Sequence, residues 1–319
     1  MIDRLYIFFI IGLLLLALIP SCNIDGDLEE CPYNVRLEYW YDDGGSANRL
    51  TDYVDRIDGF VFDSEGVLYG IDRRSGKERR YGELMVIPGK YTVVSWGNLD
   101  TMSRLYPDAQ IGKTRLADMQ LRASEIWHQV SEKLYYSSVE IDVSGRGVTR
   151  ERACMTHAHC RLNLSVVWRQ NPPEDTGNFS FRLSDAPSRY AFPVSGYIRE
   201  VLSLTTGGDF RYPLPGFLPE RRSICAAGKM NIVRTLSGEL CCYRLKDDDH
   251  PLLSIYQGET PLIEGIDLWK FFTTMHIGLN NNLRQEFDLR IELDGGKAYI
   301  STLLTSDWEE GPTIGVDEK

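Results

Sequence analysis

The sequence predicts an all-β protein made of two antiparallel β-sandwiches, and three observations support this fold class. Short segments alternate between apolar and polar residues, turns rich in Gly and Pro separate them, and segments with a helical period are nearly absent. The composition agrees, because 17 Tyr, 6 Trp and 28 Gly in 319 residues are typical of strands and tight turns. This length suits two domains, each large enough to bury a core.

Alternating strands fill the first half of the chain. In residues 35–41 every second side chain is apolar, which places Val35, Leu37 and Tyr39 on one face of a strand. The further strands that we expect here are residues 60–62, 67–69, 84–87, 91–96 and 139–143. Asp-Ser-Glu-Gly at 63–66 and Pro-Gly-Lys at 88–90 favour tight turns between neighbouring strands. The only helix that we expect is a short one near residues 124–133.

A polar, basic segment with two glycines at residues 144–152 favours a domain boundary. We therefore expect an N-terminal sandwich over residues 31–148 and a C-terminal sandwich over residues 149–319. The strands that we expect in the second half are residues 160–166, 179–183, 287–293 and 298–304. The last two flank an Asp-Gly-Gly turn and form the clearest hairpin of the chain.

The N-terminus has the features of a secretion signal. Arg4 precedes an apolar run over residues 5–19, which is shorter than the about 20 residues that a helix needs to cross a membrane. The run ends in Ile19, Pro20, Ser21 and Cys22, and this sequence resembles the lipobox of bacterial lipoproteins. The resemblance implies that signal peptidase II removes residues 1–21 and that Cys22 carries a covalent lipid. The alternative is an uncleaved anchor helix in which Cys22 is incidental.

Charge and cysteine content describe the mature protein further. Residues 22–30 are polar and acidic, and we expect them to form a flexible tether. The net charge of −11 argues against a nucleic-acid partner, because phosphate binding needs positive charge. The seven cysteines leave six besides Cys22, and the sequence does not select a disulfide pairing among them. Cys154 with Cys160, or Cys225 with one of the adjacent residues 241 and 242, are the pairs that we favour.

Few clusters suggest chemistry. His157 and His159 would point to one side of a strand and could reach one metal ion, but solvent-facing histidines are the favoured interpretation. The three aspartates at residues 247–249 suggest a solvated loop rather than a calcium site. Nucleophile-elbow and phosphate-binding motifs are absent from the sequence. We therefore predict a protein that is not an enzyme and holds no metal or other cofactor besides the lipid.

Several of these features together resemble one known family. The Glu-Cys-Pro at residues 30–32, the hairpin at 61–66 and the segment 87–98 are similar to the FimB/Mfa-type fimbrial anchor lipoproteins of Bacteroidales type V pili. The family-motif positions that we expect in the core are Phe62, Pro88, Gly89, Tyr91 and Trp96. The specific resemblance covers about residues 22–100, and the rest of the chain matches in length and strand content.

The resemblance implies two transthyretin-like sandwiches in tandem and a structural role. A family member is held in the outer membrane by its lipid, faces the cell exterior, tethers the fimbrial shaft and terminates or regulates its growth. Shaft subunits lose their first strand to an arginine-specific protease and accept a strand from a neighbour instead. An anchor would keep its first strand, here residues 35–41. The implied partners are fimbrial shaft pilin subunits and outer-membrane lipid.

Two alternatives stay open. Residues 298–304 and the tail after them are a candidate contact with another subunit, or they pair with residues 287–293 inside one sheet. The residues that would make such a contact are Ala298, Tyr299, Ile300, Leu303 and Trp308. The other functional hypothesis is a surface lipoprotein that binds glycans or proteins, with Tyr39, Tyr41, Tyr91 and Trp96 as a platform for a sugar rather than as core residues.

Overall fold

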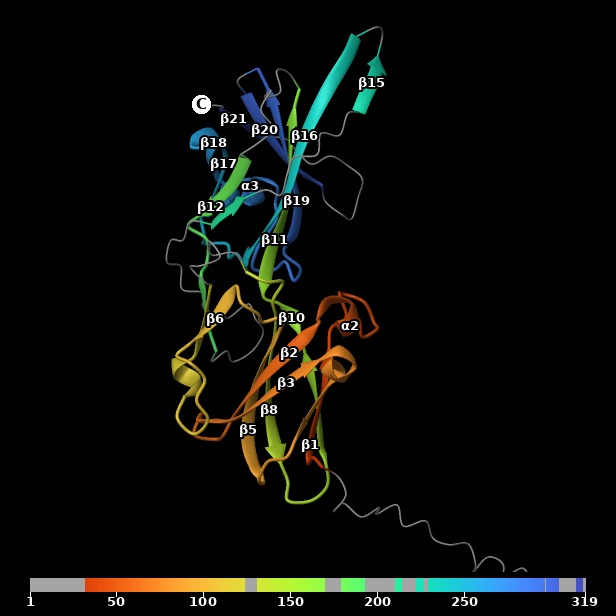
Figure 1. Ribbon diagram of the computed structural model, residues 1–319. Helices are drawn as coiled ribbons and strands as arrows, with labels where there is room; N and C mark the ends of the chain where they lie inside the picture. The colour runs from red at the N-terminus through yellow and green to blue at the C-terminus, as the bar shows by residue number, and fades with distance from the viewer. Residues whose placement is uncertain are drawn as a thin grey trace, which may run out of the picture.

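The computed structural model describes residues 32–123, 131–169, 179–192, 210–213, 222–226, 229–295, 297–303 and 314–317. Within these residues the chain forms five β-sheets, which build two bodies stacked end to end in an elongated molecule (Figure 1). The all-β prediction is confirmed. Of the predicted helix, residues 124–130 lie outside the described residues, and residues 131–133 are not helical. None of the described helices is long and apolar enough to span a membrane.

The first body consists of three layers of sheet. Its strands are β1 (Val35–Trp40), β2 (Arg56–Phe62), β3 (Leu68–Ser75), β4 (Tyr81–Leu84), β5 (Gly89–Gly97), β6 (Ser103–Tyr106), β7 (Gln120–Ala123), β8 (Tyr135–Val143), β9 (Thr149–Cys154), β10 (Thr156–His157) and β13 (Arg189–Ala191). The outer sheet has the order β4-β1-β9, the central sheet β10-β8-β5-β2-β3 and the third sheet β13-β7-β6. Helix α2 (Leu50–Tyr53) and the 3-10 turns η2 (Gly76–Arg80) and η3 (Leu116–Asp118) connect strands.

The strands β2 and β5 of the central sheet are buried on both faces, which explains why they are apolar at neighbouring positions. In β5, Tyr91 and Val93 pack toward the outer sheet, whereas Val94 and Trp96 pack toward the third sheet. The sequence of a strand that is covered on both faces is a nearly continuous run of apolar residues. The outer strand β1 buries only one face, so its apolar residues alternate with polar ones.

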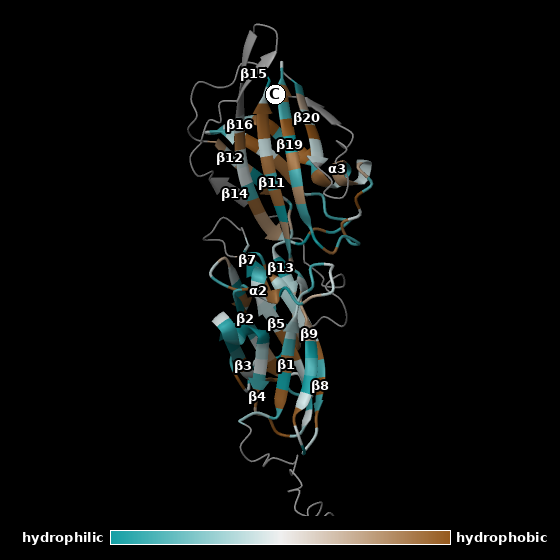
Figure 2. Cartoon of the chain, turned by 90° about the vertical axis from the view of Figure 1, so that its right-hand side faces the viewer, coloured by the Kyte–Doolittle hydropathy of each residue, from teal (hydrophilic) through white to brown (hydrophobic). Residues whose placement is uncertain are grey.

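The second body is formed by two packed sheets. Its strands are β11 (His159–Trp168), β12 (Phe179–Ser184), β14 (Phe210–Pro213), β15 (Arg222–Ala226), β16 (Lys229–Tyr243), β17 (Leu252–Gln257), β18 (Thr260–Asp267), β19 (Glu286–Asp294), β20 (Lys297–Leu303) and β21 (Ile314–Asp317). The sheet orders are β15-β16-β11-β19-β20-β21 and β14-β12-β17-β18. Figure 2 shows hydrophilic and hydrophobic residues alternating along β19, which buries every second side chain. Helix α3 (Leu268–Thr274) adds Phe271 and Phe272 to this core.

Local turn chemistry places the two predicted hairpins where the sequence puts them. At residues 63–66, one carboxylate oxygen of Asp63 accepts the N–H groups of Glu65 and Val67, both at 2.9 Å, and β2 pairs with β3. At the Asp-Gly-Gly turn, β19 pairs with β20 from Asp288↔Leu303 to Asp294↔Lys297. Both hairpin predictions are confirmed.

Two parallel strand pairs depart from the purely antiparallel sheets that the sequence predicts. β1 runs parallel to β9, and β11 runs parallel to β19. The first body therefore continues past residue 148, where we predict its end, because β9 completes its outer sheet. The polar, glycine-containing segment before β9 is a connection between two sheets of one body. Only Ala158 separates β10 of the first body from β11 of the second.

The second half of the chain also completes the core of the first body. After β12 the chain returns, and β13 pairs with β7. Tyr190 and Phe192 contact Trp96, with ring centroids 5.6 and 5.8 Å away. The Tyr190 hydroxyl donates to the carbonyl of Ala158 at 2.7 Å and accepts the backbone N–H of Arg244 at 2.6 Å. The two bodies are therefore joined by a shared core cluster and by buried hydrogen bonds.

Candidate assembly site

The first strand of the chain fills a groove between two other strands. β1 lies between β4, which is antiparallel to it, and β9, which is parallel. The side chains of Val35, Leu37 and Tyr39 point into the core and are fully buried. Removal of this strand would uncover that apolar face and the backbone edges of both neighbours. The groove is therefore occupied by the chain's own strand.

Specific polar contacts fix the register of β1. At its start, the Asn34 side chain donates to the carbonyl of Val86 at 2.6 Å and accepts the N–H of Val86 at 3.0 Å. In its middle, the hydroxyl of Tyr39 lies 3.1 Å from Oγ of Ser95, and burial raises the pKa of Tyr39 to about 12. The ring of Tyr39 packs on Gly82, where a Cβ atom would come within 3.3 Å of it. A slipped strand would lose these contacts.

The solvent face of β1 is charged. Arg36 lies 3.7 Å from Glu83 of β4, and Glu38 pairs with Arg80 at 3.0 Å. The guanidinium of Arg152 stacks over the ring of Trp40 at 4.3 Å. Exposed ion pairs of this kind each contribute at most about 1 kcal/mol, so the buried face holds the strand in place.

The family-motif residues divide between core and surface. Phe62, Tyr91 and Trp96 are buried, but Pro88 is exposed and Gly89 is half-buried. Pro88 is thus outside the core in which we expected it, because it lies in the connection between β4 and β5 at the end of the body. The buried rings of Tyr39, Tyr41, Tyr91 and Trp96 do not offer the open platform that stacking on a sugar requires.

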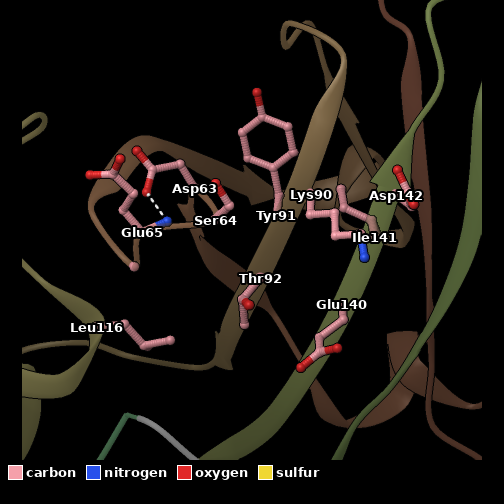
Figure 3. Close-up of a pocket in the computed structure, with 11 residues that line it drawn as sticks. Asp63, Ser64, Glu65, Lys90, Tyr91, Thr92, Leu116, Glu140, Ile141 and Asp142 are labelled. Carbon is pink, nitrogen blue, oxygen red and sulfur yellow. Dashed lines mark hydrogen bonds between the residues drawn. The ribbon is translucent and has the colours of Figure 1, made fainter.

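The two motif segments border one pocket on the first body (Figure 3). It has a volume of about 590 Å³ and lies on the part of the central sheet beside the turn at residues 63–66. Lys90 and Thr92 of β5 and Glu140 of β8 line it, together with the turn residues Asp63 and Glu65. Carboxylates outnumber the single lysine among its lining residues, so the pocket is acidic.

The C-terminal candidate contact residues are paired inside the second body. β20 lies between β19 and β21, and β21 covers it from Lys297↔Asp317 to Ile300↔Ile314. Ala298 and Ile300 are buried, Tyr299 is half-buried, and Leu303 ends the strand. The structure therefore contains the pairing within one sheet. Among the predicted site residues, five lie outside the part of the chain that the structure describes: Ile19, Pro20, Ser21, Cys22 and Trp308.

The two histidines are buried, which corrects the prediction that they face solvent. His157 and His159 are 2% and 0% exposed, and their rings stack with centroids 4.6 Å apart. Burial lowers the pKa of His157 to about 2 and that of His159 to about 4, so both imidazoles are neutral at pH 7. Both lie at the junction of the two bodies, where the second body covers the end of the first.

The aspartates at residues 247–249 form the predicted loop only in part, because Asp248 is exposed, Asp247 is half-buried and Asp249 is buried. Asp249 is buried and accepts the N–H of Lys246 at 2.8 Å. Asp247 accepts the N–H of Leu279 at 2.6 Å. Both carboxylates therefore hold backbone turns together.

Cys154, Cys160, Cys241 and Cys242 are free thiols, so the structure does not contain the favoured pair of Cys154 with Cys160. Cys225 of β15 lies opposite Met230 of β16 in the strand ladder, and not opposite Cys241 or Cys242. Cys154 is exposed whereas Cys160 is buried. Cys160 instead lies directly opposite Cys242, on the neighbouring strands β11 and β16.

Sequence reasoning missed the residues that surround the histidines. Tyr41 follows β1, Arg284 precedes β19 and Glu286 begins it, and all three approach the histidine pair. Each of them lies more than 100 residues from the histidines along the chain, and the parallel pairing of β11 with β19 brings Glu286 near them. No local pattern in the sequence carries that signal.

Comparison with solved structures finds the same fold in proteins of low sequence identity. The fimbrial anchor protein Mfa2 from Porphyromonas gingivalis has a TM-score of 0.59 and 16% identity, covering 88% of this chain and 100% of that one. A candidate adhesin from Bacteroides thetaiotaomicron has a TM-score of 0.66 and 18% identity, covering 90% and 99%. A candidate polysaccharide-binding protein from the same species has a TM-score of 0.61 and 11% identity, covering 89% and 98%.

Sequence comparison identifies the family directly. No curated protein matches the chain by sequence. The family model of the fimbrillin-A associated anchor proteins Mfa1 and Mfa2 matches residues 28–310, which is most of the 319-residue chain. The match includes β1 and its groove, the acidic pocket and both bodies. The chain is therefore a member of the family of fimbrillin-A associated anchor proteins.

Proposed function

We propose that this protein is the anchor subunit of a fimbria: a lipid on Cys22 holds it in the outer membrane, and it tethers the shaft and limits its length. Membership of the anchor family supports a fimbrial role at the cell surface. The observation that carries the proposal is the filled groove, because β1 satisfies both β4 and β9 from within the chain. A subunit with a filled groove accepts no donor strand there, so growth through that groove stops at it.

The arrangement of the ends fits a tether. β1 begins at one end of the elongated molecule, and β15, β16, β20 and β21 lie around the opposite end (Figure 1). Cys22 is ten residues before Pro32, the first described residue, and ten extended residues reach at most about 35 Å. A lipid on Cys22 would therefore keep the first body close to the membrane and present the second body to the shaft.

Exposed apolar side chains at the lipid-proximal end support this orientation. Met85 and Ile87 are 60% and 65% exposed, in the connection between β4 and β5. They flank Val86, which the Asn34 side chain holds beside the start of β1. Large apolar groups at this position suit contact with a membrane surface.

The lipid assignment is tested by membrane fractionation. Cys22→Ala should move the protein from the outer-membrane fraction to the soluble fraction, and fimbriae should be shed into the medium. Cys154→Ala is the matched control, because it removes an exposed cysteine from the first body and should change neither result. A Cys22→Ala protein that stays in the outer-membrane fraction would contradict the proposal.

The filled groove is tested with a strand peptide. The intact protein should not bind a peptide with the sequence of residues 32–41, whereas a variant with a protease site placed before residue 42 should bind it after cleavage and release of the first strand. The control peptide carries Asp at the position of Leu37, which would bury an unpaired charge. Equal binding by intact and cleaved protein would refute self-complementation.

The acidic pocket supports a second candidate function, a module that binds a glycan or a protein. Its lining of carboxylates with Lys90 suits hydroxyl-rich or cationic ligands. Glu140→Gln with Asp142→Asn should abolish such binding by the soluble protein and leave fimbrial length unchanged. Loss of anchoring in that variant would instead assign the pocket to assembly.

A further inference from the structure

A buried cluster at the junction of the two bodies has the composition of a metal site. One ligand atom from each of His157, His159 and Glu286 lies within 4.8 Å of the others. The residues come from β10, β11 and β19, so the cluster joins an edge strand of the first body's central sheet to the central strands of the second body. Both ring nitrogens that have no hydrogen-bond partner among the described residues, Nδ1 of His157 and Nε2 of His159, are fully buried.

The hydrogen bond of His159 determines which of its nitrogens carries the lone pair. Nδ1 lies 2.8 Å from the carbonyl oxygen of Leu134, which can only accept. Nδ1 therefore carries the hydrogen, and in the neutral ring Nε2 has the lone pair. This is the nitrogen that lacks a partner in the described structure.

The same argument applies to His157. Its Nε2 lies 2.7 Å from the hydroxyl of Tyr41, and that hydroxyl donates to Oδ1 of Asp43 at 3.1 Å. With its hydrogen committed to Asp43, the Tyr41 oxygen accepts from Nε2–H of His157. The lone pair of His157 is then on Nδ1, which is again the buried nitrogen without a partner.

Glu286 supplies an anionic oxygen held in place by arginines. Its Oε2 accepts from Arg161 at 2.7 Å and from the Nε of Arg284 at 3.2 Å. These contacts orient the carboxylate beside the rings. Ligating carboxylates and histidines are commonly positioned by hydrogen bonds of this kind, as the Leu134 carbonyl and Tyr41 also provide.

We propose that His157, His159 and Glu286 bind one divalent transition-metal ion, with Zn²⁺ as the favoured ion. Two imidazole nitrogens and one carboxylate oxygen are a donor set that Zn²⁺ prefers, whereas Ca²⁺ and Mg²⁺ prefer oxygen ligands alone. Coordination would use both buried lone pairs. Without a metal, each lone pair lacks a partner and its desolvation lowers the stability of the folded state. The site would cross-link the two bodies at their junction.

The charged side chains around the histidines influence how tightly the site would bind a metal ion. Arg161, Arg284 and Arg244 act on the histidines as positive charges, and a bound cation would feel the same repulsion. Asp43, which pairs with Arg284 at 3.0 Å, and Glu286 offset part of it. The donor set therefore needs a metal with strong preference for imidazole, so Zn²⁺, Cu²⁺ and Co²⁺ should bind and Mg²⁺ should not.

The test measures metal directly in the full-length protein extracted in detergent. After treatment with a chelator, one Co²⁺ per chain should bind and give the visible absorption of a nitrogen- and oxygen-ligated ion, and Zn²⁺ should displace it. Zn²⁺ should also raise the thermal unfolding temperature, and Mg²⁺ should leave it unchanged. Absence of a stoichiometric Co²⁺ spectrum would overturn the proposal.

Variants distinguish this site from adventitious binding. Glu286→Gln and His159→Gln should each weaken Co²⁺ binding at least about 10-fold, while His250→Gln, at an exposed histidine paired with Asp267, should not. Glu286 is only half-buried, so its variant should keep the native circular dichroism spectrum even if the His159 variant does not. Equal Co²⁺ affinity in wild type and Glu286→Gln would assign the binding to other surface groups and refute the site.

Discussion

Trp96 is the residue whose removal should most disturb the first body. It is 0% exposed and packs against Tyr136, Tyr190 and Phe192, with ring centroids 4.9 to 5.8 Å away. Trp96→Ala removes the whole indole from a three-sided aromatic contact, and truncation of a buried Trp costs about 3–5 kcal/mol of unfolding free energy. Because Tyr190 and Phe192 come from the second half of the chain, the cavity also opens where the two bodies share a core.

A second substitution separates packing from hydrogen bonding at this position. The indole Nε1 is buried and has no acceptor among the described residues, so its N–H already bears a desolvation cost. Trp96→Phe removes this group and keeps most of the aromatic volume, and we expect a loss of only about 1 kcal/mol.

Equilibrium unfolding in urea, followed by far-ultraviolet circular dichroism, measures both values. Ile111→Ala is the control, because this side chain is 61% exposed and its loss should change the unfolding free energy by less than about 0.5 kcal/mol. A loss below about 1 kcal/mol for Trp96→Ala would show that the aromatic cluster does not stabilise the body. An equal loss for Trp96→Phe and Trp96→Ala would show that the N–H has an acceptor.

Three further outcomes are expected. Asp267→Ala removes the side chain that accepts the N–H of Lys270 at 3.0 Å, so the free energy of unfolding should fall by about 1 kcal/mol, and Asp267→Asn should restore most of it. Asn34→Ala breaks both side-chain bonds to Val86 and should speed hydrogen exchange at the start of β1 more than elsewhere; uniform acceleration would refute a local effect. Alkylation of the native protein should label Cys154 well before Cys242, because contact with Cys160 and burial raise the pKa of the Cys242 thiol, and simultaneous labelling would contradict the burial.

Local features of the sequence were sufficient to predict β1 and two hairpins. The strand that we expected at residues 84–87 is instead β4 at Tyr81–Leu84, and residues 85–88 connect two different sheets. The turn at residues 63–66 depends on one aspartate and one glycine, and both are visible as turn residues without any tertiary information. β1 was equally predictable from the sequence, because its single buried face gives a regular alternation of apolar and polar residues. The apolar runs around Trp96 predicted strands correctly but not the third sheet that covers their second face.

Contacts between distant segments were beyond the sequence pattern. The parallel pairing of β1 with β9 moves the end of the first body, although the segment before β9 has the composition of a linker. The histidines alternate with apolar residues in a manner typical of a solvent-facing strand edge. Their burial results from the second body, whose Glu286 and Arg284 close over them.

The parallel pairing of β1 with β9 has a mechanical consequence for an anchored filament. Tension between a lipid at the N-terminus and a shaft on the second body would pull β1 at its first residue and β9 at its last. In a parallel pair these ends lie at opposite ends of the ladder, so the load acts as shear along the strands. All the paired positions from Val35↔Thr149 to Trp40↔Cys154 would then bear force together, whereas a hairpin pulled from its open end would separate one pair at a time. The outer sheet of the first body is thus oriented to resist tension applied between residue 35 and residue 154.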